Sequence, residues 1–308
     1  MRKSSRAFDL TTGSHVFDLK ELGDRTMGSI EETSYALEAL LVERNLRGMA
    51  EVKPALKPGY SLRAACLLAD VATTQGCVFI GTGFPVTDTF ETDGPVGAIA
   101  LYEALEKLGA KPVIVCGPPL SDAIAKEYRV EPLKLGTAHD RVAEAKAALA
   151  KWQPQLLLSI ERPGMAADGG YYNMRGEDIS PRTACFDSFM LECECPTIAI
   201  GDGGNEIGMG NVTSALESLN IVPASTKCDE LVIADVSNWG GYGLIALLGQ
   251  MEERDLLGEI HPIKILQYLS NLGSVDGVTR LNQLTEDGLE ASAGDELIVK
   301  LRQLTGFA

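Results

Sequence analysis

The segment richest in groups suited to chemistry is residues 201–210, which read Gly-Asp-Gly-Gly-Asn-Glu-Ile-Gly-Met-Gly. Its five glycines allow backbone N–H groups to approach a ligand closely, and its carboxyl and amide side chains supply oxygens for proton transfer or metal binding. A purely structural turn needs fewer such residues. We therefore expect an active site here, with Asp202 and Glu206 as catalytic groups and with substrate contacts from Gly203, Gly204 and Asn205.

A second polar segment, residues 81–95, combines glycine, hydroxyl and carboxyl groups. It begins Gly-Thr-Gly-Phe-Pro, and we expect Thr82 and Gly83 to line a substrate site. Glu91 and Asp93 add two carboxylates just ahead of a proline. A turn leading into a capped helix is the alternative, because proline suits the first helical turn. The segment lacks the third glycine of a dinucleotide fingerprint and the lysine of a phosphate-binding loop.

The third segment carries groups that suit an acidic ligand. Glu161 and Arg162 follow an apolar run, and Tyr172 and Arg175 come shortly after. Arginine can grip a carboxylate through two hydrogen bonds, so Arg162 or Arg175 is expected to hold an acidic substrate. Glu161 is a third candidate for acid–base catalysis, and Tyr172 is a candidate substrate contact. A surface network of glutamate and arginine is the alternative.

The fourth segment, residues 237–243, reads Ser-Asn-Trp-Gly-Gly-Tyr-Gly after another apolar run. We expect Asn238 to line a substrate pocket and Trp239 to form one of its walls. The alternative is that a serine or asparagine here caps a helix.

Together these segments would place several carboxylates around one crevice, where they repel one another. A divalent cation, protonation of one or two acids, or neighbouring arginines would relieve the repulsion. Oxygen ligands favour Mg²⁺, Mn²⁺ or Ca²⁺ over zinc. The candidate metal ligands are Glu91, Asp93 and Asp202. The three histidines fall in no motif, so neither a histidine triad nor a histidine zinc site is indicated.

The elements that must position these segments alternate along the chain. Short apolar runs predict strands near residues 77–80, 112–116, 155–160, 197–200 and 231–235. Helical periodicity predicts helices near residues 96–108, 121–128, 138–151, 181–192, 206–219 and 242–250. Apolar strands joined by helical crossovers indicate an α/β fold with a doubly wound, Rossmann-like, mostly parallel sheet. All four polar segments fall at the carboxyl ends of its strands, where such sheets bind ligands.

The two ends of the chain are predicted to be helical. An amphipathic stretch at residues 24–47, followed by prolines and a glycine, predicts a helical N-terminal extension at 1–60 ahead of an α/β domain at 61–308. The extension is expected to pack on the main body or on another subunit, so a homo-oligomer is one expectation. Residues 262–307 predict two further helices joined by a loop at 273–277.

The composition limits the kinds of partner that the protein is expected to bind. With 43 acidic and 27 basic residues and a formal charge of −16, most of the molecule would repel nucleic acid and anionic membranes. No apolar run approaches the roughly 20 residues of a membrane helix. The seven cysteines fit a reducing compartment, and the N-terminus suits neither a secretion signal nor a transit peptide. A cytoplasmic protein that binds a small acidic metabolite is therefore expected.

The four segments together resemble the domain family that forms the C-terminal half of vertebrate mitochondrial D-glutamate cyclase and also occurs in standalone bacterial proteins. The resemblance covers most of the chain after residue 60. It implies a carbon–oxygen lyase that converts D-glutamate into 5-oxo-D-proline and water. The vertebrate enzyme has a second, hydro-lyase-like domain, and residues 1–60 are too short to form it. The alternative is therefore that the activity belongs to that second domain or requires both domains.

Two other interpretations remain open at this point. In one, the glycine-rich loops cradle phosphate, and the substrate is a nucleotide or a sugar phosphate. In the other, the protein is a non-catalytic sensor of an acidic metabolite.

Overall fold

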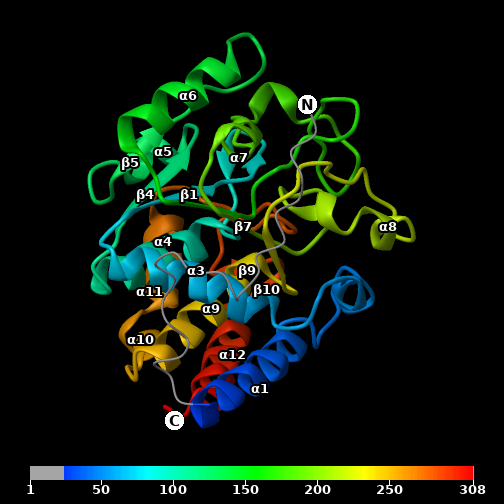
Figure 1. The fold of residues 1–308 in the computed structure, drawn as a ribbon. Coiled ribbons are helices and arrows are strands. Elements are labelled where there is room, and N and C mark those ends of the chain that lie inside the picture. The colour runs from blue at the N-terminus through cyan, green and yellow to red at the C-terminus, as the bar shows by residue number, and fades with distance from the viewer. Residues whose placement is uncertain (1–23, 308) are drawn as a thin grey trace.

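The computed structural model describes residues 24–307, in which a six-stranded sheet lies between two layers of helices (Figure 1). All six strands are parallel, in the order β5-β4-β1-β6-β7-β8. The strands are β1 (Cys77–Thr82), β4 (Lys111–Cys116), β5 (Val130–Pro132), β6 (Leu156–Ile160), β7 (Thr197–Gly201) and β8 (Glu230–Ile233). This doubly wound order, which confirms the predicted fold class, has its topological switch point between β1 and β6.

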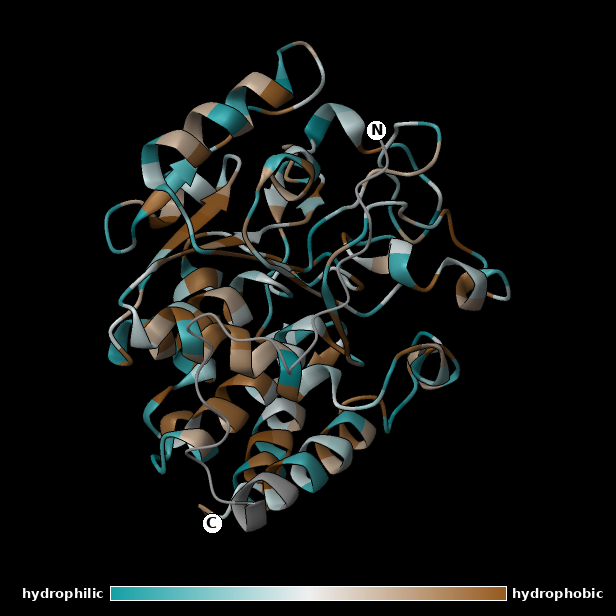
Figure 2. Ribbon diagram, in the orientation of Figure 1, coloured by the Kyte–Doolittle hydropathy of each residue, from teal (hydrophilic) through white to brown (hydrophobic). Residues whose placement is uncertain are grey.

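The strands owe their positions to continuous apolar runs. Every residue of β6 and β7 is buried, as expected of parallel strands that are covered on both faces. Figure 2 shows the hydrophobic colour concentrated along the sheet and the helices that pack on it. Five of the six strands coincide with predicted ones. The edge strand β5 was not predicted, because only one of its three residues, Val-Glu-Pro, is a good strand former.

Helices cover both faces of the sheet (Figure 1). One layer contains α3 (Tyr60–Thr73), α4 (Pro95–Lys107) and α9 (Ser237–Met251), and the other contains α6 (Arg141–Trp152) and α7 (Asp187–Glu192). The short helix α5 (Leu120–Ile124) packs against β4 and β5. Helices α4 and α9 approach closely because glycines lie where they meet. A Cβ atom on Gly97 would lie 2.9 Å from the Cα atom of Asn238. This contact brings the N-termini of both helices together at the carboxyl edge of the sheet.

The predicted N-terminal helix is α1 (Asp24–Leu40), which contacts α3, α9 and the C-terminal helix α12 (Ala291–Leu304). Leu37 and Leu41 are fully buried in the main hydrophobic core. The described part of the extension therefore shares its core with the α/β body. A turn, α2 (Met49–Val52) and the 3₁₀ helix η1 (Lys53–Ala55) lead on to α3. Residues 1–23 of the predicted extension lie outside the described residues.

The C-terminal part contains the two predicted helices, α11 (Pro262–Asn271) and α12, after the short α10 (Leu256–Glu259). Their connection is longer than the predicted loop and includes a hairpin of β9 (Thr285–Glu286) and β10 (Leu289–Glu290). The carboxylate of buried Asp276 accepts hydrogen bonds from the backbone N–H groups of Val278, Thr279 and Gly288. This side chain ties the loop to the hairpin.

Several predicted helices are wrong in extent. Helix α1 ends at Leu40 and not near residue 47, and α9 begins at Ser237 and not at residue 242. Residues 206–219 contain only the 3₁₀ helix η3 (Met209–Asn211) and α8 (Thr213–Leu216), because Gly208 has a φ of +94° and residue 210 packs against the Ser225 carbonyl. Residues 181–192 divide into η2 (Ser180–Arg182) and α7, and α5 ends at Ile124. A small hairpin of β2 (Pro85–Val86) and β3 (Thr89–Phe90) was not predicted.

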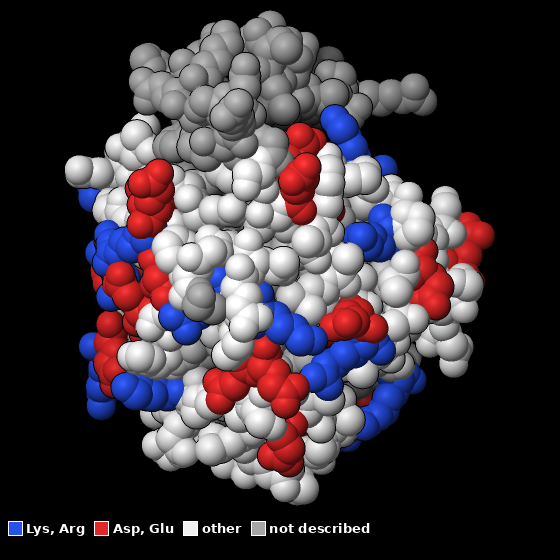
Figure 3. Space-filling view, turned by 90° about the horizontal axis from the view of Figure 1, so that it is seen from below, with Lys and Arg blue, Asp and Glu red and all other residues white. Residues whose placement is uncertain are grey.

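The surface carries both signs of charge. On the face shown in Figure 3, acidic and basic side chains are interspersed among uncharged ones. Pairs such as Lys300–Glu43 (3.2 Å) and Arg302–Asp255 (2.6 Å) join neighbouring elements. Within residues 24–307, no helix has both the length and the apolar character needed to cross a membrane.

Candidate functional site

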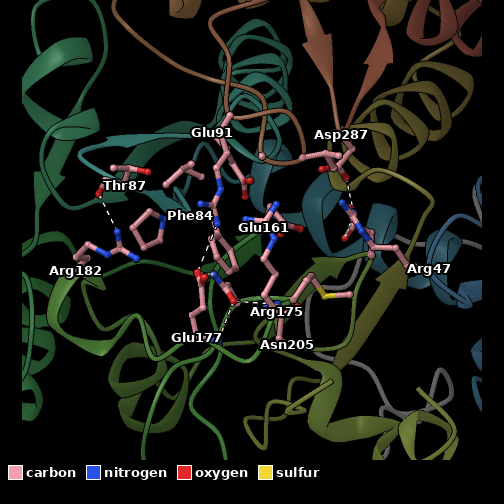
Figure 4. Close-up of a pocket in the computed structure, with 18 residues that line it drawn as sticks. Arg47, Phe84, Thr87, Glu91, Glu161, Arg175, Glu177, Arg182, Asn205 and Asp287 are labelled. Atoms are coloured by element: carbon pink, nitrogen blue, oxygen red, sulfur yellow. Dashed lines mark hydrogen bonds and ion pairs between the residues drawn. The ribbon is translucent and has the colours of Figure 1, made fainter. Parts of the chain in front are cut away.

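Five buried carboxyl groups gather at the carboxyl edge of the sheet, and we call them the acidic centre; Figure 4 labels Glu91, Glu161 and Asp287 among them. They are Glu91, Asp93, Glu161, Asp202 and Asp287. Two of them directly follow β6 and β7, two lie between β3 and α4, and one forms the turn of the β9–β10 hairpin. The doubly wound topology brings these segments together, since parallel strands end at one edge of the sheet.

The N-terminus of α9 holds Asp93. Its carboxylate accepts hydrogen bonds from the backbone N–H groups of Ser237 (2.9 Å) and Asn238 (2.7 Å). These N–H groups have no partner within the helix, and the positive end of the helix dipole favours an acidic group there. A 15-residue helix thus fixes Asp93 within the centre.

Glu161 is placed by an unusual backbone conformation. Its φ of +41° is rare for a residue with a side chain and turns the chain sharply as β6 ends. Its carboxylate accepts a hydrogen bond from the Ser237 hydroxyl at 2.6 Å. Strained conformations of this kind cluster at functional sites, which agrees with the role predicted for Glu161.

Arg47 supplies positive charge to the acidic centre. Its Nη1 lies 2.7 Å from Oδ1 of Asp202 and donates a hydrogen bond to Asp287. Arg47 lies in the turn after α1, and Asp287 lies in the β9–β10 hairpin near the other end of the chain. Both therefore join the acids that follow the strands in one site.

The acidic centre cannot carry five negative charges at neutral pH. Burial, reinforced by neighbouring acids, raises the pKa of Glu91 and Glu161 well above the usual range and that of Asp93 to about 8. Burial also raises the pKa of Asp202, against the opposing effect of Arg47. For Asp287, burial disfavours ionisation, but contact with Arg47 holds the pKa below its ordinary value. Several acids therefore hold protons unless a cation takes their place.

The glycine-rich loop after β7 is folded by its own glutamate. The Glu206 carboxylate accepts hydrogen bonds from the N–H groups of Gly203 (2.8 Å) and Gly204 (2.7 Å), and burial raises its pKa. Asn205 donates to the Tyr172 carbonyl at 2.9 Å, and its buried Oδ1 has no partner among the described residues. Asn205 lines the cavity described below, whereas Glu206 lies behind the loop.

The structure places Arg162 among backbone carbonyls. Its guanidinium donates to the carbonyls of Thr82 and Gly83, each at 2.8 Å, and to that of Ala184. It is 3% exposed, and burial lowers its pKa. Arg162 thus ties the end of β1 to neighbouring loops and does not line the cavity beside the acidic centre. The buried Thr82 hydroxyl has no partner in the described part of the chain.

Asn238 acts between helices. Its Oδ1 accepts hydrogen bonds from the N–H groups of Gly94 (2.8 Å) and Gly97 (2.7 Å), and its Nδ2 donates to Glu286 at 2.7 Å. Trp239 is buried beneath the guanidinium of Arg44 and is not among the residues that line the cavity. The structure thus places both side chains behind the acidic centre.

A cavity of about 230 Å³ opens beside the acidic centre (Figure 4). Four acids of the centre line it, all but Asp93, and Arg47 lines it too. The lining also includes three arginines that we call the arginine rim: Arg175, Arg182 and Arg280. Arg182 donates to the Thr87 carbonyl at 3.2 Å and Arg280 lies 3.5 Å from Glu177, while the Arg175 side chain has no partner among residues 24–307. The cavity thus offers both carboxyl groups and arginines to a ligand.

Tyr172 and Glu91 lie apart from the groups with which they were predicted to act. The Tyr172 hydroxyl donates to Asp168 at 2.7 Å, outside the cavity. Of the predicted metal ligands, Asp93 and Asp202 group most closely with Glu161, since one oxygen of each lies within 4.8 Å of the other two. The third predicted ligand, Glu91, packs against Gly277, where a Cβ atom would lie 2.0 Å from its Oε2.

Sequence reasoning missed Arg47 and Asp287. The Asp-Gly pair at 287–288 is a hairpin signal, and it would have drawn attention to Asp287. Arg47 stands among ordinary surface residues in the sequence, and no local signal marks it.

Fold and site together define the class: a doubly wound α/β protein with a buried acidic site beside its switch point. A family model described as D-glutamate cyclase-like, C-terminal, matches residues 37–302, and the chain belongs to this family. Mitochondrial D-glutamate cyclase from Homo sapiens is 35% identical over 198 residues, which are 56% of this chain and 32% of the human protein. The match thus spans about a third of that relative's length.

Two solved structures show weaker likeness. RecJ from Thermus thermophilus in complex with Mn²⁺ is 14% identical, with a TM-score of 0.36 over 80% of this chain and 29% of that one. An exopolyphosphatase-related protein from Bacteroides fragilis is 9% identical, with a TM-score of 0.37 over 78% and 57% of the two chains. At these TM-scores neither likeness informs the function.

Proposed function

We propose that this protein converts D-glutamate into 5-oxo-D-proline and water. Family membership and the human relative's activity support this reaction. The observation that carries the proposal is the cavity itself, which is lined both by arginines and by acids whose pKa burial raises. Its volume of about 230 Å³ lies below the usual range for drug-sized ligands and suits a small metabolite. D-Glutamate carries two carboxylates for the arginines and an amine for the acids.

The reaction joins the substrate's amine to its own γ-carboxyl carbon. A C–N bond forms and a C–O bond breaks, and the two protons that the ammonium group loses leave with the oxygen as water. Glu161 lines the cavity and has a raised pKa, so we assign the proton transfers to it. Glu206 is assigned a positioning role, because its carboxylate holds Gly203 and Gly204.

We propose Arg175 as the ligand of the α-carboxylate. It lines the cavity without a partner among the described residues, whereas Arg162 is occupied by backbone carbonyls. Asn205 lines the same cavity.

A divalent cation is a further part of the proposal. Asp93, Glu161 and Asp202 offer three oxygens in one small region, and Mg²⁺, Mn²⁺ or Ca²⁺ accept such ligands. The ion is the alternative to protons in the acidic centre, and with Glu161 as a ligand the proton transfers would fall to another group. When bound, the ion would neutralise the acids and polarise the γ-carboxyl group. Melting curves with each ion and after EDTA treatment test this part. Stabilisation by one of the ions supports it, and unchanged melting with all three ions contradicts it.

The deciding assay is incubation with D-glutamate without ATP, with 5-oxoproline followed by proton NMR. L-Glutamate serves as the stereochemical control, and the Asp202→Asn variant serves as the protein control. We expect product from D-glutamate with the wild-type protein. Formation no faster than in buffer would contradict the proposal, and stabilisation by D-glutamate without turnover would indicate a sensor instead.

The phosphate-cradle interpretation is less well supported. The N–H groups of Gly203 and Gly204, which would have to bind the phosphate, already donate to Glu206. A phosphate there would displace a buried carboxylate of the same sign.

A further inference from the structure

Arg47 uses only part of its hydrogen-bonding capacity on the protein. Its Nη1 meets both Asp202 and Asp287. Within residues 24–307, Nε and Nη2 have no hydrogen-bond partner, yet the side chain lines the cavity and is 19% exposed. These two nitrogens lie on one edge of the guanidinium, which is the edge that binds a carboxylate through two parallel hydrogen bonds.

We propose that this free edge of Arg47 binds the γ-carboxylate of the substrate, so that Arg47 is a catalytic residue. The inference rests on the proposed function. In Figure 4, Arg47 and Asp287 lie at one end of the cavity, with Arg175 and Asn205 apart from them. A dicarboxylate held between Arg47 and Arg175 would have one carboxylate on each arginine.

The position suits the chemistry of the γ-carboxyl group. That group must lie near the acids that protonate its departing oxygen, although a carboxylate is repelled by ionised acids. Arg47 pairs with the acid whose ionised form is most favoured, Asp287, and still presents donors to the substrate. As the amine attacks, negative charge gathers on the carboxyl oxygens, and a fixed guanidinium stabilises it. Arg47 keeps its own protons throughout.

The backbone that carries Arg47 is held by the end of β8. The Asp235 carboxylate accepts hydrogen bonds from the N–H groups of Arg44 (2.8 Å) and Leu46 (3.3 Å), and the Asp235 N–H donates to the Leu41 carbonyl at 2.7 Å. The turn is therefore fixed before any ligand arrives, as a preorganised site requires. Arg44 lies in the same turn but pairs weakly with Glu296 at 3.7 Å outside the cavity, which makes it a matched control.

Calorimetric titration with glutarate and butyrate tests the inference. Glutarate has both carboxylates and no amine, so it cannot cyclise, and butyrate lacks one carboxylate. We expect the wild-type protein to bind glutarate at least about tenfold more tightly than butyrate, because a charged hydrogen bond contributes that much. Arg47→Lys keeps the charge but lacks the planar edge, and the preference should fall to about twofold or less. Arg44→Lys should retain the wild-type preference.

The outcomes separate this inference from the proposed function. A full glutarate preference in Arg47→Lys, or none in the wild type, would overturn the role of Arg47 even where D-glutamate is cyclised. Loss of the preference in Arg47→Lys alone would support that role even where no 5-oxoproline forms. Arg47→Gln is measured in parallel, and circular dichroism shows which variants are folded. If one Arg47 variant does not fold, the glutarate preference of the other variant tests the role of Arg47.

Discussion

The acidic centre and the arginine rim face the same cavity but are built in opposite ways. The acids of the centre are buried and stand on strand ends, a helix N-terminus and a tight hairpin, and hydrogen bonds from Ser237 and Asn238 hold three of them. Of the rim arginines, Arg175 and Arg280 stand on loops and are exposed, and Arg182 ends the 3₁₀ helix η2 and is partly exposed; they make single contacts of 3.2–3.5 Å or none.

We propose that this difference separates proton transfer, in the acidic centre, from substrate recognition, at the arginine rim. Buried, backbone-held acids have fixed positions and shifted pKa values, which proton transfer requires. Exposed arginines on loops can adjust to a ligand, and their weak pairs are easily exchanged for a carboxylate. Changes in the centre should therefore affect turnover and pH dependence, and changes in the rim should affect affinity.

The largest effect is expected from Asp202→Asn. The substitution removes an acid that touches both Arg47 and the cluster of Asp93 and Glu161. We expect 5-oxoproline formation to fall by about a thousandfold or more, which corresponds to roughly 4 kcal/mol of transition-state stabilisation. The melting temperature should stay near that of the wild type, because asparagine has the same shape. Near-normal turnover in the variant would remove Asp202 from the mechanism.

The second prediction concerns Glu286, a buried acid behind the centre. Burial raises its pKa to about 7, so its contribution to stability is complete below about pH 4.5 and is lost as the pH rises through about 7. Oε1 accepts from both Asn238 and Tyr242, a role that glutamine can keep. Glu286→Gln should therefore be more stable than the wild type at pH 8 by roughly 2–3 kcal/mol.

Urea unfolding of both proteins between pH 4 and pH 8 measures this difference. The two curves should converge at low pH, where glutamate is protonated as well. A constant difference across the range would show that the effect does not come from ionisation.

A rim substitution should have a smaller effect of a different kind. Arg175→Gln removes the charge proposed for the α-carboxylate, and KM for D-glutamate should rise about tenfold, equivalent to roughly 1.4 kcal/mol. We expect kcat and the melting temperature to change little. Steady-state kinetics separate the two parameters. A fall in kcat with constant KM would show that Arg175 acts in the chemical steps, as we propose for the acidic centre, and not in substrate binding.

The smallest effect is expected for Glu177→Gln, which frees Arg280 from its 3.5 Å ion pair. Exposed pairs contribute about 0–1 kcal/mol, so stability should be almost unchanged. A released Arg280 should lower KM by up to about threefold through its added attraction for the anionic substrate. Stability loss beyond about 1 kcal/mol in urea unfolding would show that the rim is as rigid as the centre.

Much of the fold was predictable because its signals are local. Apolar runs located five strands, and helical periodicity located α4, α6, α9 and both C-terminal helices. The prediction failed where glycines and side-chain hydrogen bonds decide the backbone, as in residues 206–219. There the Glu206 carboxylate turns back on Gly203 and Gly204, and helical spacing of apolar residues carries no information about that contact.

The sequence by itself determined the sheet, the family and the acids that follow its strands, because residue type, spacing and strand order act through neighbours in the chain. Only the tertiary structure decided how the charges are paired. It set Arg162 against backbone carbonyls and brought Arg47 to Asp202 and Asp287. A buried charge must find its partner in space, and that partner can stand anywhere in the chain.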